Sequence, residues 1–187
     1  MSDSPHLQHI NIKLFINDSA EIDLEKTIPL FHSWIQDQSL DDLLIDVADY
    51  RHVPSGPGVI LVGHNAHYSF DNAEGELGIL YNRKTVSESD PVEQLCQAAD
   101  VVRTVCRMIA EDDAFKGRFG IATDRIQVLV NDRLLGTNDQ EGFDRLLPDL
   151  SAALVRMFGE QDYEFERALD PRKRLSVMVR IPQGFTL

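Results

Sequence analysis

The side chains with the clearest capacity for chemistry are histidines, and all of them lie in the first 67 residues: His6, His9, His32, His52, His64 and His67. Two of them, His64 and His67, form a His-x-x-His pattern in strand-like sequence. Residues three apart in a regular strand point to opposite faces, so a shared metal ion would require a bulge, which Gly63 allows. With His52, these histidines support one hypothesis, a metal-responsive protein. The competing interpretation is that they only make hydrogen bonds at a hairpin.

A second arrangement pairs a carboxylate with an imidazole. If the turn at 53–57 closes a simple hairpin, Asp46 lies opposite His64, and directly opposed residues have Cβ atoms about 4.5–5.5 Å apart. A carboxylate fixes the tautomer of a neighbouring imidazole, as in the orientation of a general base. Asp46 and His64 are therefore candidate catalytic residues, although such pairs are also common as structural contacts. The candidate ligand-binding residues around them are His67, Tyr50 and Tyr68.

Familiar catalytic motifs do not occur in the sequence. There is no His-Glu-x-x-His, Gly-x-Ser-x-Gly or Cys-x-x-Cys pattern, no EF-hand loop and no phosphate-binding loop. The glycine-rich segment 55–58 precedes a strand pattern, so it offers no helix N-terminus to a phosphate. The two cysteines, Cys96 and Cys106, fall about 15 Å apart along one expected helix, which is too far for a disulfide. These absences favour binding over catalysis.

Hydrophobic periodicity predicts the elements that must position these side chains. Alternation predicts a strand over 10–16, and a helix over 24–35 follows, in which Pro29 kinks the helix or shifts its start. Three β-type runs then cover 43–50, 59–70 and 77–82. In the first run, alternation places Leu43, Ile45 and Val47 on one face and leaves the Asp46 face free for polar groups.

A long apolar helix is expected next. Asp90, Pro91 and Glu93 form a capping box with a proline at the first helical position, so the helix runs over 91–110. Its apolar residues cover well over half of the circumference. Such a helix is buried on more than one side, by its own chain or by a partner subunit. We therefore expect a homodimer or higher homo-oligomer through helix 91–110.

The second half of the chain repeats the pattern of the first. It reads as a short edge strand at 119–122, a strand at 126–130, a helix that ends near 158, and a hairpin of 163–168 with 175–181. Pro148 falls where Pro29 falls in the first helix, which supports an internal duplication. We predict an α+β fold of two β-α-β-β units, with mostly antiparallel sheet and helices packed on one face. The sequence does not decide between one continuous sheet and two facing sheets.

The expected domain organisation is a single domain over 1–187, with unit one at about 10–85, a linking helix at about 90–110 and unit two at about 126–182. The formal net charge of −13 disfavours nucleic acid and membrane surfaces as partners. The basic run 172–174 is interpreted as a solvated hairpin turn. The start of the sequence shows no signal-peptide pattern, and no apolar run suits a bilayer, so a cytoplasmic location is expected.

Three functional hypotheses follow from these residues. The leading one is a soluble, non-catalytic binding or assembly protein, for which a small-molecule ligand remains open. The second is a small hydrolase or isomerase-like enzyme that uses Asp46 and His64, and the third is a metal-responsive protein that uses His52, His64 and His67. No cofactor is indicated by any motif.

Overall fold

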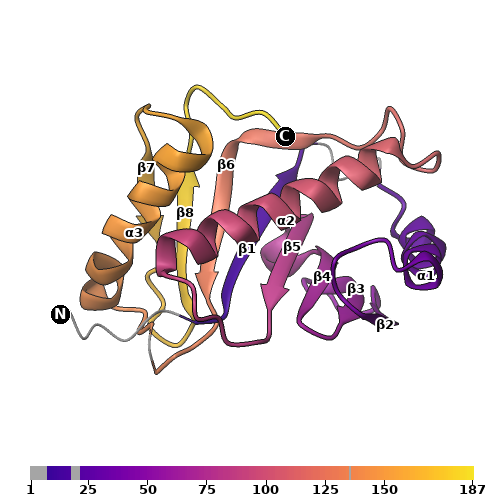
Figure 1. Cartoon of the computed structure of the whole chain (residues 1–187), viewed down its shortest axis with the longest axis horizontal. Helices are drawn as coiled ribbons and strands as arrows, with labels where there is room; N and C mark the ends of the chain where they lie inside the picture. Colours follow the sequence, from indigo (N-terminus) through magenta and orange to yellow (C-terminus); the bar gives the residue numbers. More distant parts are fainter. Residues whose placement is uncertain (1–7, 18–21, 135) are drawn as a thin grey trace.

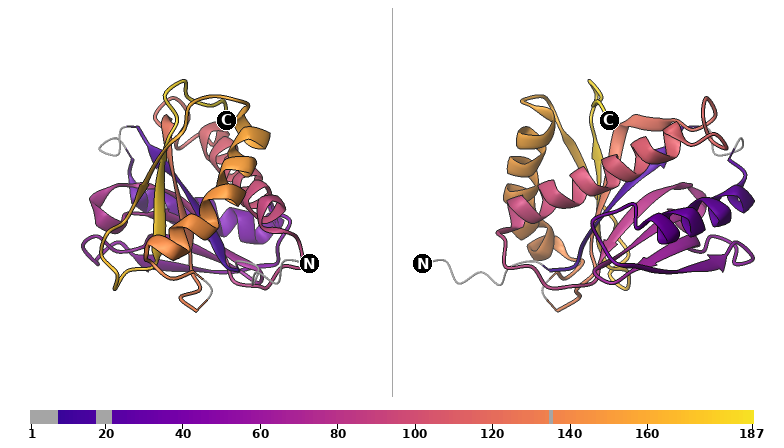
Figure 2. Two further views of the ribbon diagram at one scale, coloured as in Figure 1. Left: turned by 90° about the vertical axis from the view of Figure 1, so that its left-hand side faces the viewer. Right: turned by 45° about the vertical axis from the view of Figure 1, so that its right-hand side comes forward.

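The computed structural model describes residues 8–17, 22–134 and 136–187. Its strands form one antiparallel sheet in the order β2-β3-β4-β5-β1-β6-β8-β7, and the α-helices pack on one face of that sheet (Figures 1 and 2). The strands are β1 Ile10–Ile16, β2 Leu44–Tyr50, β3 Gly58–Gly63, β4 Ala66–Asp71, β5 Gly78–Arg83, β6 Ile121–Val130, β7 Glu164–Arg167 and β8 Leu175–Arg180. The helices are η2 Leu24–Lys26, α1 Thr27–Asp37, η3 Ala73–Gly75, α2 Pro91–Glu111 and α3 Gln140–Phe158. This arrangement confirms the α+β class and decides for one sheet.

The main core lies between the sheet and its helices. The helix-facing row of β1, which contains Ile10, Ile12 and Leu14, is almost completely buried. Helix α2 lies across β1 and β5, and α3 packs beside it (Figure 1). The wide apolar arc of α2 is therefore buried within the chain, by the sheet on one side and by α3 on another. The apolar arc of α2 therefore gives no support to the expectation of a partner subunit at this helix.

Local sequence signals fix the helix starts. The Asp90 carboxylate accepts a hydrogen bond from the Glu93 N–H at 3.0 Å, with Pro91 at the first helical position, as expected. Pro29 is the third residue of α1, because a 3-10 turn precedes it and the helix proper begins at Thr27. Pro148 instead lies in the interior of α3. The two prolines are therefore not equivalent in their helices, and this argument for duplication fails.

The strand order bears on the duplication in another way. In the second half β8 lies between β6 and β7, and in the first half β3 lies on the β1 side of β2. Two β-α-β-β units related by a twofold axis between β1 and β6 would give this order if the hairpin of β4 and β5 were inserted between β3 and β1. The duplication itself stays a prediction.

Two details of the strands differ from the sequence expectations. The predicted run 59–70 is a hairpin of β3 and β4 that turns at His64 and Asn65, and segments 119–122 and 126–130 join in β6. In β2 a bulge between Leu44 and Asp46 interrupts the alternation, so Leu43 and Ile45 are 61% and 53% exposed. The expected apolar row through Leu43, Ile45 and Val47 is therefore wrong. Within the described ranges, none of the helices has the length and apolarity needed to cross a bilayer.

Gly58 supplies a test of the β3–β4 packing. Its φ is +64°, and a Cβ atom there would lie 2.0 Å from the carbonyl oxygen of Phe70. We expect Gly58→Ala to lower the free energy of unfolding by at least about 2 kcal/mol in urea titrations, from strain and clash together. The matched control is Gly117→Ala, where φ is +74° but no atom lies within 4 Å, and about 1 kcal/mol is expected. Equal losses in the two variants would contradict the steric explanation.

Candidate functional site

The predicted pairing of Asp46 with His64 is wrong. Strand β2 pairs with β3 so that Asp46 lies opposite Val62 and Tyr50 lies opposite Gly58. The connecting turn spans 51–57 and is two residues longer than the simple hairpin assumed, so the register slips by two residues. His64 is exposed in the β3–β4 turn, and the Asp46 carboxylate accepts a hydrogen bond from its neighbour's N–H. The structure does not bring this carboxylate and this imidazole together.

The other predicted site residues are dispersed over different surfaces. His67 lies on the helix-free face of β4, opposite Asn82, where burial and the charge of Lys84 lower its pKa. Tyr68 points to the helix side and is buried, whereas Tyr50 and His52 are exposed with their rings stacked. Among the described residues, no three His, Cys, Asp or Glu side chains gather as metal ligands. His6 lies outside the described residues.

Asp42, which the sequence analysis did not single out, organises this region. Its carboxylate accepts hydrogen bonds from the N–H groups of Asn65 and Ala66, at 2.9 and 3.1 Å, and from the Tyr68 hydroxyl at 3.3 Å. Burial, together with the Asp42 charge, raises the pKa of Tyr68. These contacts hold the β3–β4 turn in place, so the polar groups here have a structural role. The only sequence signal was an acidic pair just before β2.

A second, unexpected cluster of polar groups lies on the face of the sheet that no α-helix covers. Strand register places Lys13, Leu80 and Gln127 in one row on this face. The buried polar side chains of the same face are Asn11, Lys13, Ser69, Asp71 and Ser176. An antiparallel sheet can expose one face to water, but burial of polar groups on that face requires something to cover them.

The segment around η3 covers one side of this face. The Lys13 ammonium lies 2.6 Å from Asp71, with side-chain exposures of 3% and 7%, and it also donates to the Glu76 carbonyl at 2.6 Å. The Glu76 carboxylate accepts from Arg125 at 3.0 Å, and the Arg125 guanidinium lies 4.5 Å from the centre of the Phe15 ring. Together these contacts draw residues 72–77 over β1 and form one wall of a groove.

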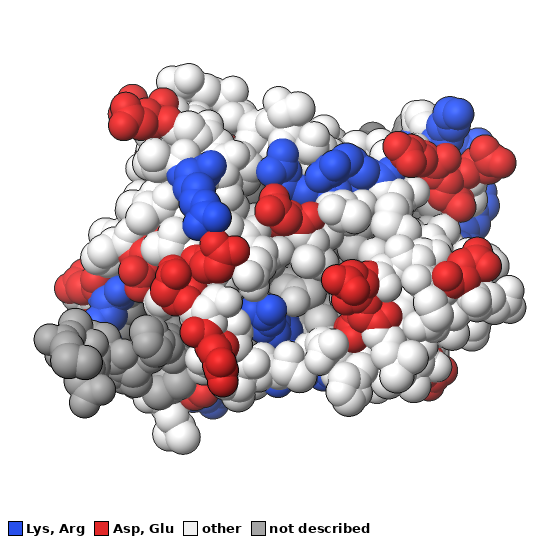
Figure 3. Space-filling view, viewed as in Figure 1, with Lys and Arg blue, Asp and Glu red and all other residues white. Residues whose placement is uncertain are grey.

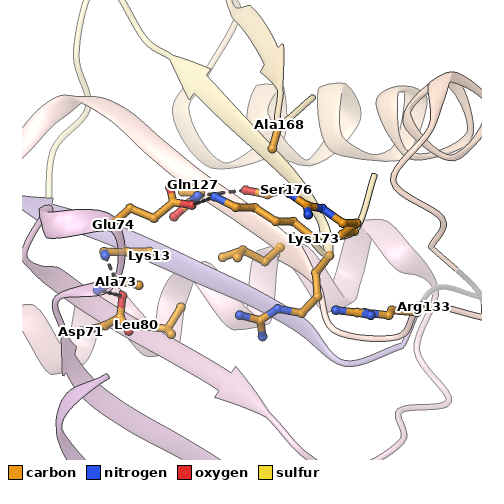
Figure 4. A pocket seen from close by; sticks show the side chains of 13 residues that line it. Lys13, Asp71, Ala73, Glu74, Leu80, Gln127, Arg133, Ala168, Lys173 and Ser176 are labelled. Carbon is orange, nitrogen blue, oxygen red and sulfur yellow. Dashed lines mark hydrogen bonds and ion pairs between the residues drawn. The ribbon is translucent and has the colours of Figure 1, made fainter. Parts of the chain in front are cut away.

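The turn between β7 and β8 forms the opposite wall. Lys173 reaches across from this turn to the Glu74 carboxylate, and the two walls meet at this ion pair (Figure 4). Gln127 donates to the Ser176 hydroxyl at 2.9 Å on the floor between them. The enclosed pocket has a volume of about 340 Å³, and its lining residues are Lys13, Asp71, Ala73, Glu74, Leu80, Gln127, Leu129, Arg133, Ala168, Arg172, Lys173, Arg174 and Ser176. We call it the sheet groove.

Charge is unevenly distributed around the sheet groove. Its two lysines are paired with Asp71 and Glu74, and Arg172 is paired with Asp170 at 3.0 Å.

Two cations of the sheet groove lack a counter-charge. Arg174 donates to the neutral amide oxygen of Asn131 at 3.0 Å, and Arg133 makes no hydrogen bond or ion pair with any described residue. These two guanidinium groups lie at one end of the groove and give it a local positive field in an acidic protein. On the helix side, by contrast, basic and acidic side chains are interspersed (Figure 3).

Among the described residues that line the sheet groove, no hydroxyl is paired with a general base. Ser176 is its only described hydroxyl, and its hydrogen-bond partner is an amide, Gln127, instead of a general base. The interpretation of residues 172–174 as a hairpin turn is correct. No local sequence pattern indicates that this turn folds over the sheet. The usable signal was Lys13, a lysine in the middle of a strand that is apolar apart from Asn11.

The Lys13–Asp71 pair should dominate the stability of this wall. We expect Asp71→Ala to lower the free energy of unfolding by about 3–5 kcal/mol, because it leaves a buried ammonium without its carboxylate. The double variant Lys13→Met/Asp71→Leu should recover most of that loss, since neither charge is then buried. Chemical denaturation of the two variants and the wild type measures both effects, and a double variant no more stable than the single one would contradict the account.

The structural role of Asp42 can be tested by comparing its substitution with that of the neighbouring Asp41. Asp42→Ala leaves the N–H groups of the β3–β4 turn without their acceptor and should cost about 1–3 kcal/mol in thermal or urea unfolding. Asp41→Ala removes the same charge from an exposed position and should change stability by less than about 0.5 kcal/mol. If the two substitutions have the same effect, Asp42 does not organise the turn.

Comparison with known proteins adds no functional information. No protein-family model matches this sequence, and no curated protein matches it. The function has to be argued from the sheet groove and the surfaces of the fold.

Proposed function

We propose that this is a non-catalytic binding protein that takes a small organic anion into the sheet groove. The observation that carries the proposal is the pair of guanidinium groups without a counter-charge, Arg133 and Arg174, at the end of a groove with a buried polar floor. In a chain of net charge −13, an anion reaches the protein against its mean field, so a local cationic site must supply the attraction.

The lining of the groove describes the ligand. A carboxylate or phosphate would bind the guanidinium groups of Arg133 and Arg174, which favour planar, two-point contacts with such anions. The side chains of Leu80 and Leu129 offer apolar contact next to this end. The volume of about 340 Å³ falls at the lower end of the range of small-molecule sites. A compact organic acid or monophosphate with an apolar portion fits these features.

The groove continues beyond the pocket. A second hollow shares Glu74, Gln127, Ala168 and Ser176 with it and extends along β6 and β8 toward Arg125 and Arg180. A ligand bound by its anionic end at Arg133 could therefore extend past the Gln127–Ser176 hydrogen bond. We expect elongated anions to bind more tightly than compact ones of equal charge.

The other two hypotheses have less support. The enzyme hypothesis depended on Asp46 opposite His64, which the strand register does not provide. The metal hypothesis depended on three clustered histidines, and no such cluster occurs among the described residues. The groove accommodates a small anion, whereas the negative net charge still disfavours a long polyanion such as nucleic acid.

Titration calorimetry tests the proposal. A panel of straight-chain mono- and dicarboxylates, inorganic phosphate and sugar monophosphates is first screened by thermal shift, and the best compound is then titrated. Arg133→Glu and Arg174→Glu should each weaken binding at least about tenfold, which corresponds to one lost charge-assisted contact of about 1.4 kcal/mol.

The control is Arg107→Glu, which makes the same change of charge at an exposed position of α2, away from the groove. Its affinity should stay within a factor of two or so of the wild type, because screening limits distant charges. Equal weakening in all three variants would mean that only the overall field matters. A panel without any binder would overturn the proposal.

A further inference from the structure

The two ends of the sheet differ in how well their edges are protected. Strand β7 ends one side with four residues, three of which are charged, Glu164, Glu166 and Arg167. Strand β2 ends the other side with seven residues, and none of the described strands lies beside its outer backbone edge. Short, charged edge strands resist further pairing, and long, uncharged ones invite it.

Exposed apolar side chains gather at the β2 edge. Of the eight large hydrophobic residues that are exposed in the described parts of the chain, four lie in or beside this strand: Leu43, Ile45, Tyr50 and Val53. None of these residues lines the sheet groove or its extension. The Gln38 side chain bonds the N–H and C=O of Leu44, and the Asp46 carboxylate bonds the N–H of Val47, but no described strand pairs with this edge. The β2 edge is thus a separate surface where apolar contact area adjoins a strand edge that is open to strand addition.

The charges on β2 do not prevent such pairing. Arg51 binds the Asp49 carboxylate through two nitrogens at 2.9 Å and holds the pKa of Asp49 at about 2. Asp46 is the other carboxylate of the strand, and its one described contact is with the N–H of Val47. An added strand therefore has to avoid placing a carboxylate opposite Asp46.

We propose that a second copy of this chain adds its β2 to the β2 edge, antiparallel, so that two sheets become one in a twofold-symmetric dimer. In a continuous sheet of two copies, the helices of both copies lie on the same side. Each residue of one β2 is then paired with a residue whose side chain points to the same side of the sheet. The axis then passes midway between the two copies of one β2 residue, which face each other. Centring on Asp46 or Asp49 would oppose identical carboxylates, which is unfavourable.

Centring on Ala48 gives a compatible register. Asp46 then faces Tyr50 of the other copy, and Val47 faces Asp49, whose charge Arg51 already balances. All five residues from 46 to 50 lie beyond the β2 bulge, in the regular part of the strand. A second copy therefore offers an equally long edge strand that meets β2 without opposing two carboxylates, which favours it as the occupant.

Light scattering of the full chain over a concentration series tests the dimer. The wild type should approach twice the chain mass of 21.1 kDa as concentration rises. Ala48→Lys places two ammonium groups opposite each other at the axis and should keep the protein monomeric, with an unchanged circular dichroism spectrum. The control Val155→Lys, at an exposed apolar position of α3, should leave the mass unchanged.

A cysteine at the axis tests the register without depending on Ala48→Lys. Opposed residues have Cβ atoms about 4.5–5.5 Å apart, so Ala48→Cys should form an intersubunit disulfide under mild oxidation. Both native cysteines are buried, and the control Leu169→Cys introduces an exposed thiol on a distant turn. A monomeric wild type, or cross-linking of Ala48→Cys no faster than that of Leu169→Cys, overturns the proposal. Because the groove lies elsewhere, loss of the dimer and loss of anion binding can be told apart.

Discussion

The buried ion pair between Lys13 and Asp71 is the constraint on which the helix-free face of the sheet depends. A lysine ammonium without water must find acceptors, and this one finds the Asp71 carboxylate and the Glu76 carbonyl, each at 2.6 Å. Both acceptors belong to the end of β4 and the segment that follows it. Satisfying Lys13 therefore holds residues 72–77 over the centre of the sheet, and the wall of the groove exists because of that requirement.

The two faces of the sheet follow opposite rules. On the helix side, β1 and its neighbours present rows of isoleucine, leucine and valine, which gain stability simply by leaving water. On the other side the same strands present Asn11, Lys13 and Gln127, which gain nothing from burial unless each polar atom finds a partner. The polar floor therefore depends on hydrogen-bond and ion-pair partners, and Asp71 at the end of β4, the segment around η3 and Ser176 of β8 supply some of them.

Much of the architecture was predictable because it depends on local patterns. Alternation identified β1, capping chemistry located the start of α2 at Pro91, and the Asp170-Pro171 turn located the last hairpin. What failed was everything that depends on register. A turn two residues longer than assumed moved Asp46 away from His64, and a bulge at Leu44 exposed Ile45. One inserted residue reverses the face of every side chain beyond it, and no local signal records the insertion.

The groove escaped prediction for a related reason. Its parts are distant in sequence: Lys173 meets Glu74, and Arg174 meets Asn131, only after eight strands have paired in an order that begins with β2 and ends with β7. Histidines were considered first because they titrate near neutral pH, but in the structure His52 and His64 lie exposed in turns. The better guide would have been a charged residue in a place where burial was already certain. Lys13 lies at the centre of a strand that is apolar apart from Asn11, so its buried ammonium requires a counter-charge, and the segment that follows the Asp71 carboxylate also forms one wall of the sheet groove.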